Sequence, residues 1–148
     1  MAQINLARVL IGGIAAGVVA NVLDFAITSY LMAGELAEML TRLSIDPEAI
    51  GSSVTVFVVV DFVWGLLLVF TYAAIRPRFG PGPKTAVITG IILWLAIVLL
   101  EAQLTAIGIW TLVSYIQTSV VYLLSGVAAS LVGSALYKEK SDANRGAA

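Results

Sequence analysis

The sequence has 148 residues, of which 60% are hydrophobic and 11% are charged, and its mean hydropathy is +1.02. A soluble domain is about half apolar and a quarter charged, and a chain this short cannot hide such a surplus of apolar side chains in its interior. The net charge is −1, so no excess of positive charge favours nucleic acid as a partner. The composition excludes an ordinary soluble domain and predicts an integral membrane protein that contacts the lipid bilayer.

Four segments provide the roughly 20 largely apolar residues that a membrane-spanning helix needs. They cover residues 6–32, 52–75, 85–107 and 111–137. We predict an all-α fold, an antiparallel four-helix transmembrane bundle within residues 1–137. The polar residues 138–148 predict a disordered cytoplasmic tail.

The first connection, residues 33–51, is acidic and carries its own helical pattern. Its apolar residues recur at helical spacing: Leu36, Met39, Leu40 and Leu43. This pattern predicts a short amphipathic helix in the membrane interface, in the first outer loop. Asp46 followed by Pro47 is typical of a helix start, with a capping side chain before a first-turn proline.

The other two connections are shorter. Residues 76–84 contain three of the four prolines, which predicts a stiff, non-helical turn. Residues 108–110 leave so little chain between the last two segments that these segments should pack as a tight helical pair.

The basic residues predict the orientation in the membrane. All but one flank the same side of the predicted bundle: Arg8, Arg76, Arg78, Lys84, Lys138, Lys140 and Arg145. Only Arg42 falls on the other side. The positive-inside rule therefore predicts that both termini are cytoplasmic.

Three stretches carry a resemblance to a known family. They are the opening Arg8–Gly13 with Asn21 and Asp24, the central run Tyr72–Lys84, and the ending Leu136–Glu139. Together they resemble an uncharacterised family of small bacterial four-helix inner-membrane proteins. The resemblance implies a bacterial inner-membrane location and no assigned activity.

Three acidic residues lie inside the predicted spans: Asp24, Asp61 and Glu101. Each is about 15 to 17 residues from the nearest cytoplasmic base, which places all three about 22–26 Å from the cytoplasmic boundary at 1.5 Å per residue. On a helical wheel each acid shares a face with the small and polar residues of its own helix. Such faces point toward other helices, so the three carboxyl groups should converge near the outer end of the bundle.

We expect other residues on these faces to form hydrogen bonds with the acids or to pack between helices. Asn21, Thr28 and Tyr122 could donate hydrogen bonds to the acids, and Trp64 and Trp94 either pack in the core or line a cavity. The small residues that should let helices approach closely are Gly13, Gly17, Gly126 and Gly133.

No lysine or arginine lies at this depth within any span. Since a charge at the bilayer centre costs at least about 2.5–3.5 kcal/mol, the acids must be protonated, hydrated from outside or neutralised by a bound group. Three interpretations stay open at this point: a shared ion- or proton-binding site, structural hydrogen bonds between helices, and contacts with another protein.

Cysteine and histidine are both absent. Their absence excludes thiolate metal sites and removes the usual protein ligand of haem, copper and zinc. The sequence also lacks a glycine-rich phosphate loop and a nucleophile elbow. We therefore expect no cofactor, no metal centre and no enzymatic activity.

Two functional hypotheses follow. The first is a transporter-like bundle that binds a proton or small cation through Asp24, Asp61 and Glu101. The second is an accessory or assembly subunit of a larger membrane complex, or a homo-oligomer, because small and polar faces can also pair with foreign helices.

Overall fold

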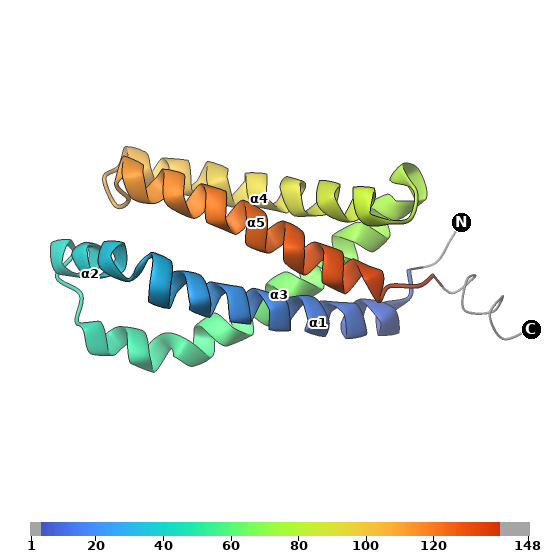
Figure 1. The fold of residues 1–148 in the computed structure, drawn as a ribbon, viewed down its shortest axis with the longest axis horizontal. Coiled ribbons are helices and arrows are strands. Elements are labelled where there is room, and N and C mark those ends of the chain that lie inside the picture. The colour runs from blue at the N-terminus through green and yellow to red at the C-terminus, as the bar shows by residue number, and fades with distance from the viewer. Residues whose placement is uncertain (1–3, 140–148) are drawn as a thin grey trace, which may run out of the picture.

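This computed structural model describes residues 4–139, and every regular element within them is a helix (Figure 1). In chain order the helices are α1 (Leu6–Ala26), the π-helix η1 (Ile27–Leu31), α2 (Ala33–Arg42), α3 (Pro47–Phe79), α4 (Pro83–Ala106) and α5 (Leu112–Ala135). Four helices are long and apolar enough to cross a membrane: α1 continued by η1, α3, α4 and α5. The prediction of an all-helical chain with four such helices is confirmed. Lys140, Arg145 and nearly all of the predicted tail lie outside the described residues.

The helix boundaries follow local sequence signals. Asp46 caps α3, because its carboxylate accepts a hydrogen bond of 2.9 Å from the backbone N–H of Glu48, and Pro47 occupies the first turn. This confirms the predicted helix start. At α5, the Thr111 hydroxyl accepts from the N–H of Ser114 at 3.0 Å in the same way. Short polar side chains before a helix satisfy amide groups that have no partner inside it.

The prediction of a non-helical turn over residues 76–84 is wrong except for residues 80–82, since α3 continues through Pro77 to Phe79 and α4 begins at Pro83. A proline inside a helix removes one backbone hydrogen bond, and near the end of a long helix the remaining bonds hold the last turn together. The helix stops at Gly80, whose φ of 85° suits glycine and whose N–H bonds to the carbonyl of Arg76 at 2.8 Å. Only residues 80–82 separate α3 from α4.

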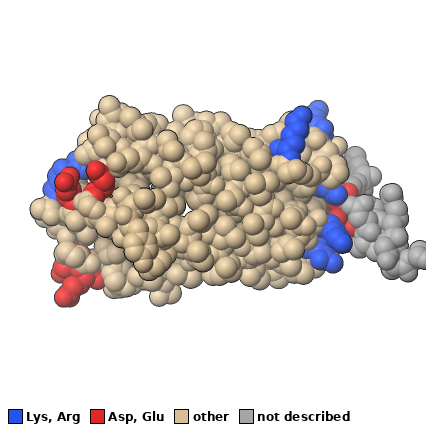
Figure 2. Space-filling view, in the orientation of Figure 1, with Lys and Arg blue, Asp and Glu red and all other residues tan. Residues whose placement is uncertain are grey.

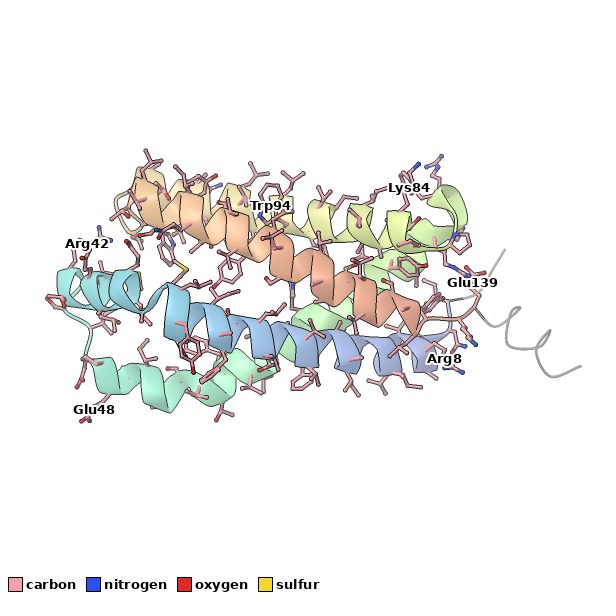
Figure 3. The ribbon with its side chains drawn as sticks, viewed as in Figure 1. Arg8, Arg42, Glu48, Lys84, Trp94 and Glu139 are labelled. Atoms are coloured by element: carbon pink, nitrogen blue, oxygen red, sulfur yellow. The ribbon has the colours of Figure 1, made fainter. Side chains whose placement is uncertain are left out.

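Charged side chains gather at two opposite ends of the molecule, and the face shown in Figure 2 is uncharged between them. At the end that we call the basic end lie Arg8, Arg76, Arg78, Lys84 and Lys138; Figure 3 labels Arg8 and Lys84 there. At the other, which we call the acidic end, lie Glu35, Glu38, Asp46 and Glu48 together with Arg42. The start of α1 and the end of α5 both lie at the basic end (Figure 1).

The buried apolar core lies in the half of the molecule nearer the basic end. Its members come from the first half of α1, the second half of α3, the start of α4 and the end of α5: Val9, Ala16, Leu68, Val69, Tyr72, Ala73, Ala86, Ala129 and Tyr137. The half nearer the acidic end buries far fewer apolar side chains. Packing between the helices is therefore concentrated at one end.

Glycines allow α1 and α3 to cross in direct contact. A Cβ atom on Gly13 would lie 2.5 Å from the side chain of Leu66, and one on Gly17 would lie 2.5 Å from Phe62. From the other helix, Gly65 faces the backbone of both Gly13 and Gly17. Side chains larger than hydrogen at these positions would push the helices apart, so this crossing depends on glycine.

Two tyrosines close the basic end. The rings of Tyr72 and Tyr137 meet edge to face with their centroids 5.9 Å apart. The Tyr72 hydroxyl accepts a hydrogen bond from the N–H of Gly82 at 3.0 Å, and the Tyr137 hydroxyl accepts one from the N–H of Asn5 at 3.2 Å. These contacts join the start of α1, the end of α3, the following turn and the end of α5.

An ion pair reinforces the same end. The guanidinium of Arg76 lies 2.8 Å from the carboxylate of Glu139 and 5.8 Å from the ring centroid of Tyr137. Both charged side chains are largely shielded from solvent, at 12% and 15% exposure. Shielding strengthens such a pair relative to one on an open surface.

Candidate functional site

In the half nearer the acidic end, α3 diverges from α4 (Figure 1), and a cavity of about 400 Å³ lies between the helices. The first turns of α3 lie far from α4 in Figure 1, whereas its last turns lie beside α4. Consistent with this divergence, residues 54–60 of α3 are all exposed. All five α-helices and η1 contribute side chains to the cavity wall.

Two of the predicted acids share this cavity. Asp24 comes from α1 and Asp61 from α3, and their carboxylates are close enough to interact electrostatically. The hydroxyl of Tyr122, on α5, donates a hydrogen bond of 3.3 Å to Asp24. No described residue donates a hydrogen bond to Asp61, and no lysine or arginine lines the cavity. The cavity wall therefore carries two carboxyl groups and no basic side chain.

Glu101 is placed differently. It does not line the cavity, and its carboxylate accepts a hydrogen bond of 3.3 Å from the hydroxyl of Thr118 on α5. Among residues 4–139, no three acidic side chains lie close enough together to hold a metal ion. The expected convergence of three acids is thus seen for Asp24 and Asp61, with Glu101 against the neighbouring helix, near enough to Tyr122 to interact electrostatically.

Of the residues predicted to form hydrogen bonds with the acids, some line the cavity and one does not. Tyr122 binds Asp24 as described, and Thr28 lines the cavity from the π-helix η1. Asn21 instead donates to the carbonyl of Gly17 at 2.9 Å and to that of Val58 on α3 at 3.4 Å. Asn21 therefore links α1 to α3 and does not line the cavity.

The remaining wall is apolar and aromatic. Trp64 from α3, Trp94 from α4 and Phe57 from α3 face the cavity together with Leu36 and Ile97. The indole N–H of Trp94 donates a hydrogen bond of 2.7 Å to the carbonyl of Ser119, which holds the ring against α5. Figure 3 labels Trp94 on α4, between the two charged ends. Both tryptophans thus line the cavity, and Trp64 also packs against the buried core.

The predicted packing glycines fall into two groups. Gly13 and Gly17 face α3, and Gly133 on α5 is pressed against Val69 and the backbone of Gly12. At Gly126, by contrast, a Cβ atom would meet nothing within 4 Å, because this residue lines the cavity. Gly126 is therefore not a point of close helix contact, although it shares a helix face with Gly133.

Helix α2 covers the acidic end of the cavity and is fixed to the α4–α5 side. The guanidinium of Arg42 donates hydrogen bonds to the carbonyls of Gly108, at 2.6 Å, and Ile109. The hydroxyl of Ser114 donates to the carboxylate of Glu35 at 2.6 Å. One residue of α2, Leu36, reaches the cavity.

Sequence reasoning missed these contacts of α2. Arg42 is the only base in an acidic loop, and that isolation is the one signal that pointed to a specific partner. The partner proved to be a pair of backbone carbonyls, which no side-chain pattern reveals. Glu35 carried no comparable signal because it is one of several acids in the same loop.

Comparison with known proteins returned no matching family model, no matching curated protein and no matching solved structure. The function therefore has to be inferred from the geometry and chemistry of the cavity.

Proposed function

We propose that the protein is a small transporter-like membrane bundle that binds a proton or a cation in the cavity between α1, α3 and α5. One observation carries the proposal: Asp24 and Asp61, from different helices, face one cavity that no lysine or arginine lines. Two carboxylates in a poorly hydrated site repel each other, and binding of a positive charge relieves that repulsion. A proton and a cation would then compete for the same oxygens.

The proposal includes a topology. The four long helices form an antiparallel bundle in a bacterial inner membrane, with both termini and the basic end in the cytoplasm. The order of contacts between α1 and α3 supports the antiparallel arrangement. Gly13 packs against Leu66, whereas Gly17, which is later in α1, packs against Phe62, which is earlier in α3. The cluster of bases at one end supports the orientation. Helix α2 would lie in the outer interface.

The test uses amide variants of the two acids in liposomes that contain a pH-sensitive dye. Wild type, Asp24→Asn, Asp61→Asn and the double variant are compared for proton flux driven by a sodium or potassium gradient. We expect each single amide to reduce the flux and the double variant to abolish it. Glu48→Gln is the matched control, because it removes one exposed carboxylate at the same end without touching the cavity. Equal fluxes for all five proteins would contradict the proposal.

A second candidate function is an accessory subunit of a larger membrane complex. The stretch 54–60 of α3 favours it, because every residue in this stretch is exposed. A partner helix could cover this stretch in place of lipid. Mass measurement after extraction in mild detergent separates the two functions, since a lone monomer would speak against the subunit.

A further inference from the structure

The size and wall of the cavity restrict what it can hold. A volume of about 400 Å³ falls within the range of sites for small organic molecules, about 300–1,000 Å³. A metal ion surrounded by protein needs six or more oxygen ligands in the case of Ca²⁺ or Mg²⁺. The cavity wall is mostly apolar, and its two carboxylates are not joined by a third. Neither Ca²⁺ nor Mg²⁺ matches such a wall.

The aromatic side chains match a different class of ligand. Trp64, Trp94 and Tyr122 line the same space as the two acids. Aromatic rings attract cations through their electron-rich faces, and this attraction is strongest where water is excluded. Apolar walls also bind the alkyl or aryl body of a ligand. The wall therefore combines attraction for positive charge with attraction for apolar surface.

The two acids have different surroundings. The Asp24 carboxylate already accepts a hydrogen bond from Tyr122, whereas no described residue donates one to Asp61. A carboxylate with unused lone pairs gains the most from an incoming cation. Asp61 is therefore the group best placed to pair with a ligand's charge, and Asp24 adds to the negative potential from across the cavity.

We propose that the cavity binds a monovalent organic cation, a substituted ammonium with an aromatic or branched alkyl body, and that Asp61 is its counter-ion. This inference rests on the proposed cation-binding function and names the class of its substrate. Its physical basis is that one site offers both an unpaired anion and an aromatic wall.

The test measures binding to the purified full-length protein in detergent by isothermal titration calorimetry. The probe is benzyltrimethylammonium, and its neutral control is neopentylbenzene, which has the same shape but carbon in place of the charged nitrogen. Tetramethylammonium tests charge without an aromatic body. We expect saturable binding of benzyltrimethylammonium, with affinity at least about tenfold lower for the other two compounds.

Variants then assign the counter-ion. We expect Asp61→Asn to weaken binding of benzyltrimethylammonium at least about tenfold, Asp61→Glu to retain most of it, and Glu48→Gln to leave it unchanged. Circular dichroism and gel filtration show that each variant is folded. Binding of the neutral compound with equal affinity, or unchanged binding to Asp61→Asn, would overturn the inference.

The two proposals can fail separately. If the amide variants lose their gradient-driven proton flux but wild type does not bind benzyltrimethylammonium, the ligand class is wrong while the cation-binding function stands. If the amide variants change neither flux nor binding, both are wrong.

Discussion

The two halves of this protein differ in packing although they share a similar apolar composition. Near the basic end, glycine positions bring α1 and α3 into direct contact, and Tyr72 and Tyr137 join three helices. Near the acidic end, residues 54–60 of α3 are exposed and a cavity lies beside them. Within a membrane, apolar character alone does not drive helices together, so contact depends on small residues and hydrogen bonds. The difference predicts that the close-packed half supports the structure, while the open half holds the cavity with its two carboxyl groups.

The largest effect on stability is expected from adding one methyl group where α1 and α3 cross. Gly65→Ala would place a Cβ atom against the backbone of Gly13 and Gly17, which cannot move aside as a side chain can. We expect a loss of about 3 kcal/mol of stability, seen as a lower midpoint of thermal unfolding in detergent. The matched control is Gly126→Ala, where a Cβ atom meets open space. There we expect stability to be unchanged or raised by up to about 1 kcal/mol, and equal losses at both positions would contradict the contrast.

A smaller effect is expected from the hydrogen bonds at the basic end. Tyr72→Phe keeps the ring but leaves the N–H of Gly82 without its acceptor. An unsatisfied donor costs about 1–3 kcal/mol where it is buried, and this one is only partly buried, so the unfolding midpoint should fall by less than in Gly65→Ala. Tyr30→Phe is the control, since Tyr30 is 79% exposed. A midpoint for Tyr72→Phe no lower than that of Tyr30→Phe would show that the tyrosine contacts do not hold this end.

A mutation at the acidic end should change hydrogen exchange only in α2. Arg42→Gln shortens the side chain that binds the carbonyls of Gly108 and Ile109. We expect amide hydrogen exchange within α2 to become about fivefold faster, with exchange in the core of α3 unchanged. Arg78→Gln removes an exposed base at the other end and serves as the control. Faster exchange throughout the bundle would mean that α2 supports the whole fold and not the cavity alone.

The smallest effect is expected at Glu101. Because this carboxylate lies outside the cavity and is bound by Thr118, Glu101→Gln should change the affinity for benzyltrimethylammonium by less than about twofold. The comparison is with Asp61→Asn in the same titration. An effect of Glu101→Gln as large as that of Asp61→Asn would restore the original expectation of three acids in one site.

Much of the fold was accessible from the sequence because hydropathy and capping act locally. Runs of apolar residues predicted the four long helices, and Asp46 with Pro47 predicted where α3 begins. The end of α3 was not predicted, since the effect of Pro77 depends on how many helical bonds surround it. The π-helix η1 was not predicted either, because its apolar residues continue the pattern of an ordinary helix.

The candidate site was accessible only in part, for a geometric reason. Shared depth and small-residue faces suggested that Asp24 and Asp61 face one space, and both line the cavity together with Tyr122. The same reasoning could not separate Glu101 from them or show that Gly126 faces a cavity. A helical wheel gives the direction of a side chain from its own axis, whereas a cavity depends on how far two axes diverge beyond their crossing.

That crossing has a mechanical consequence. Toward the acidic end, α3 continues for about 27 Å past Gly65 at 1.5 Å per residue, and the hydrogen bond from Asn21 to the carbonyl of Val58 links this arm to α1. A tilt of about 5° around Gly65 would displace the first turn of α3 by about 2 Å, and Arg76, on the shorter arm of the same helix, by about 1.4 Å in the opposite direction. A tilt of α3 as a rigid rod would thus change the width of the cavity without melting any helix, and the contacts of Tyr72 and Arg76 at the opposite end would have to adjust by a smaller distance.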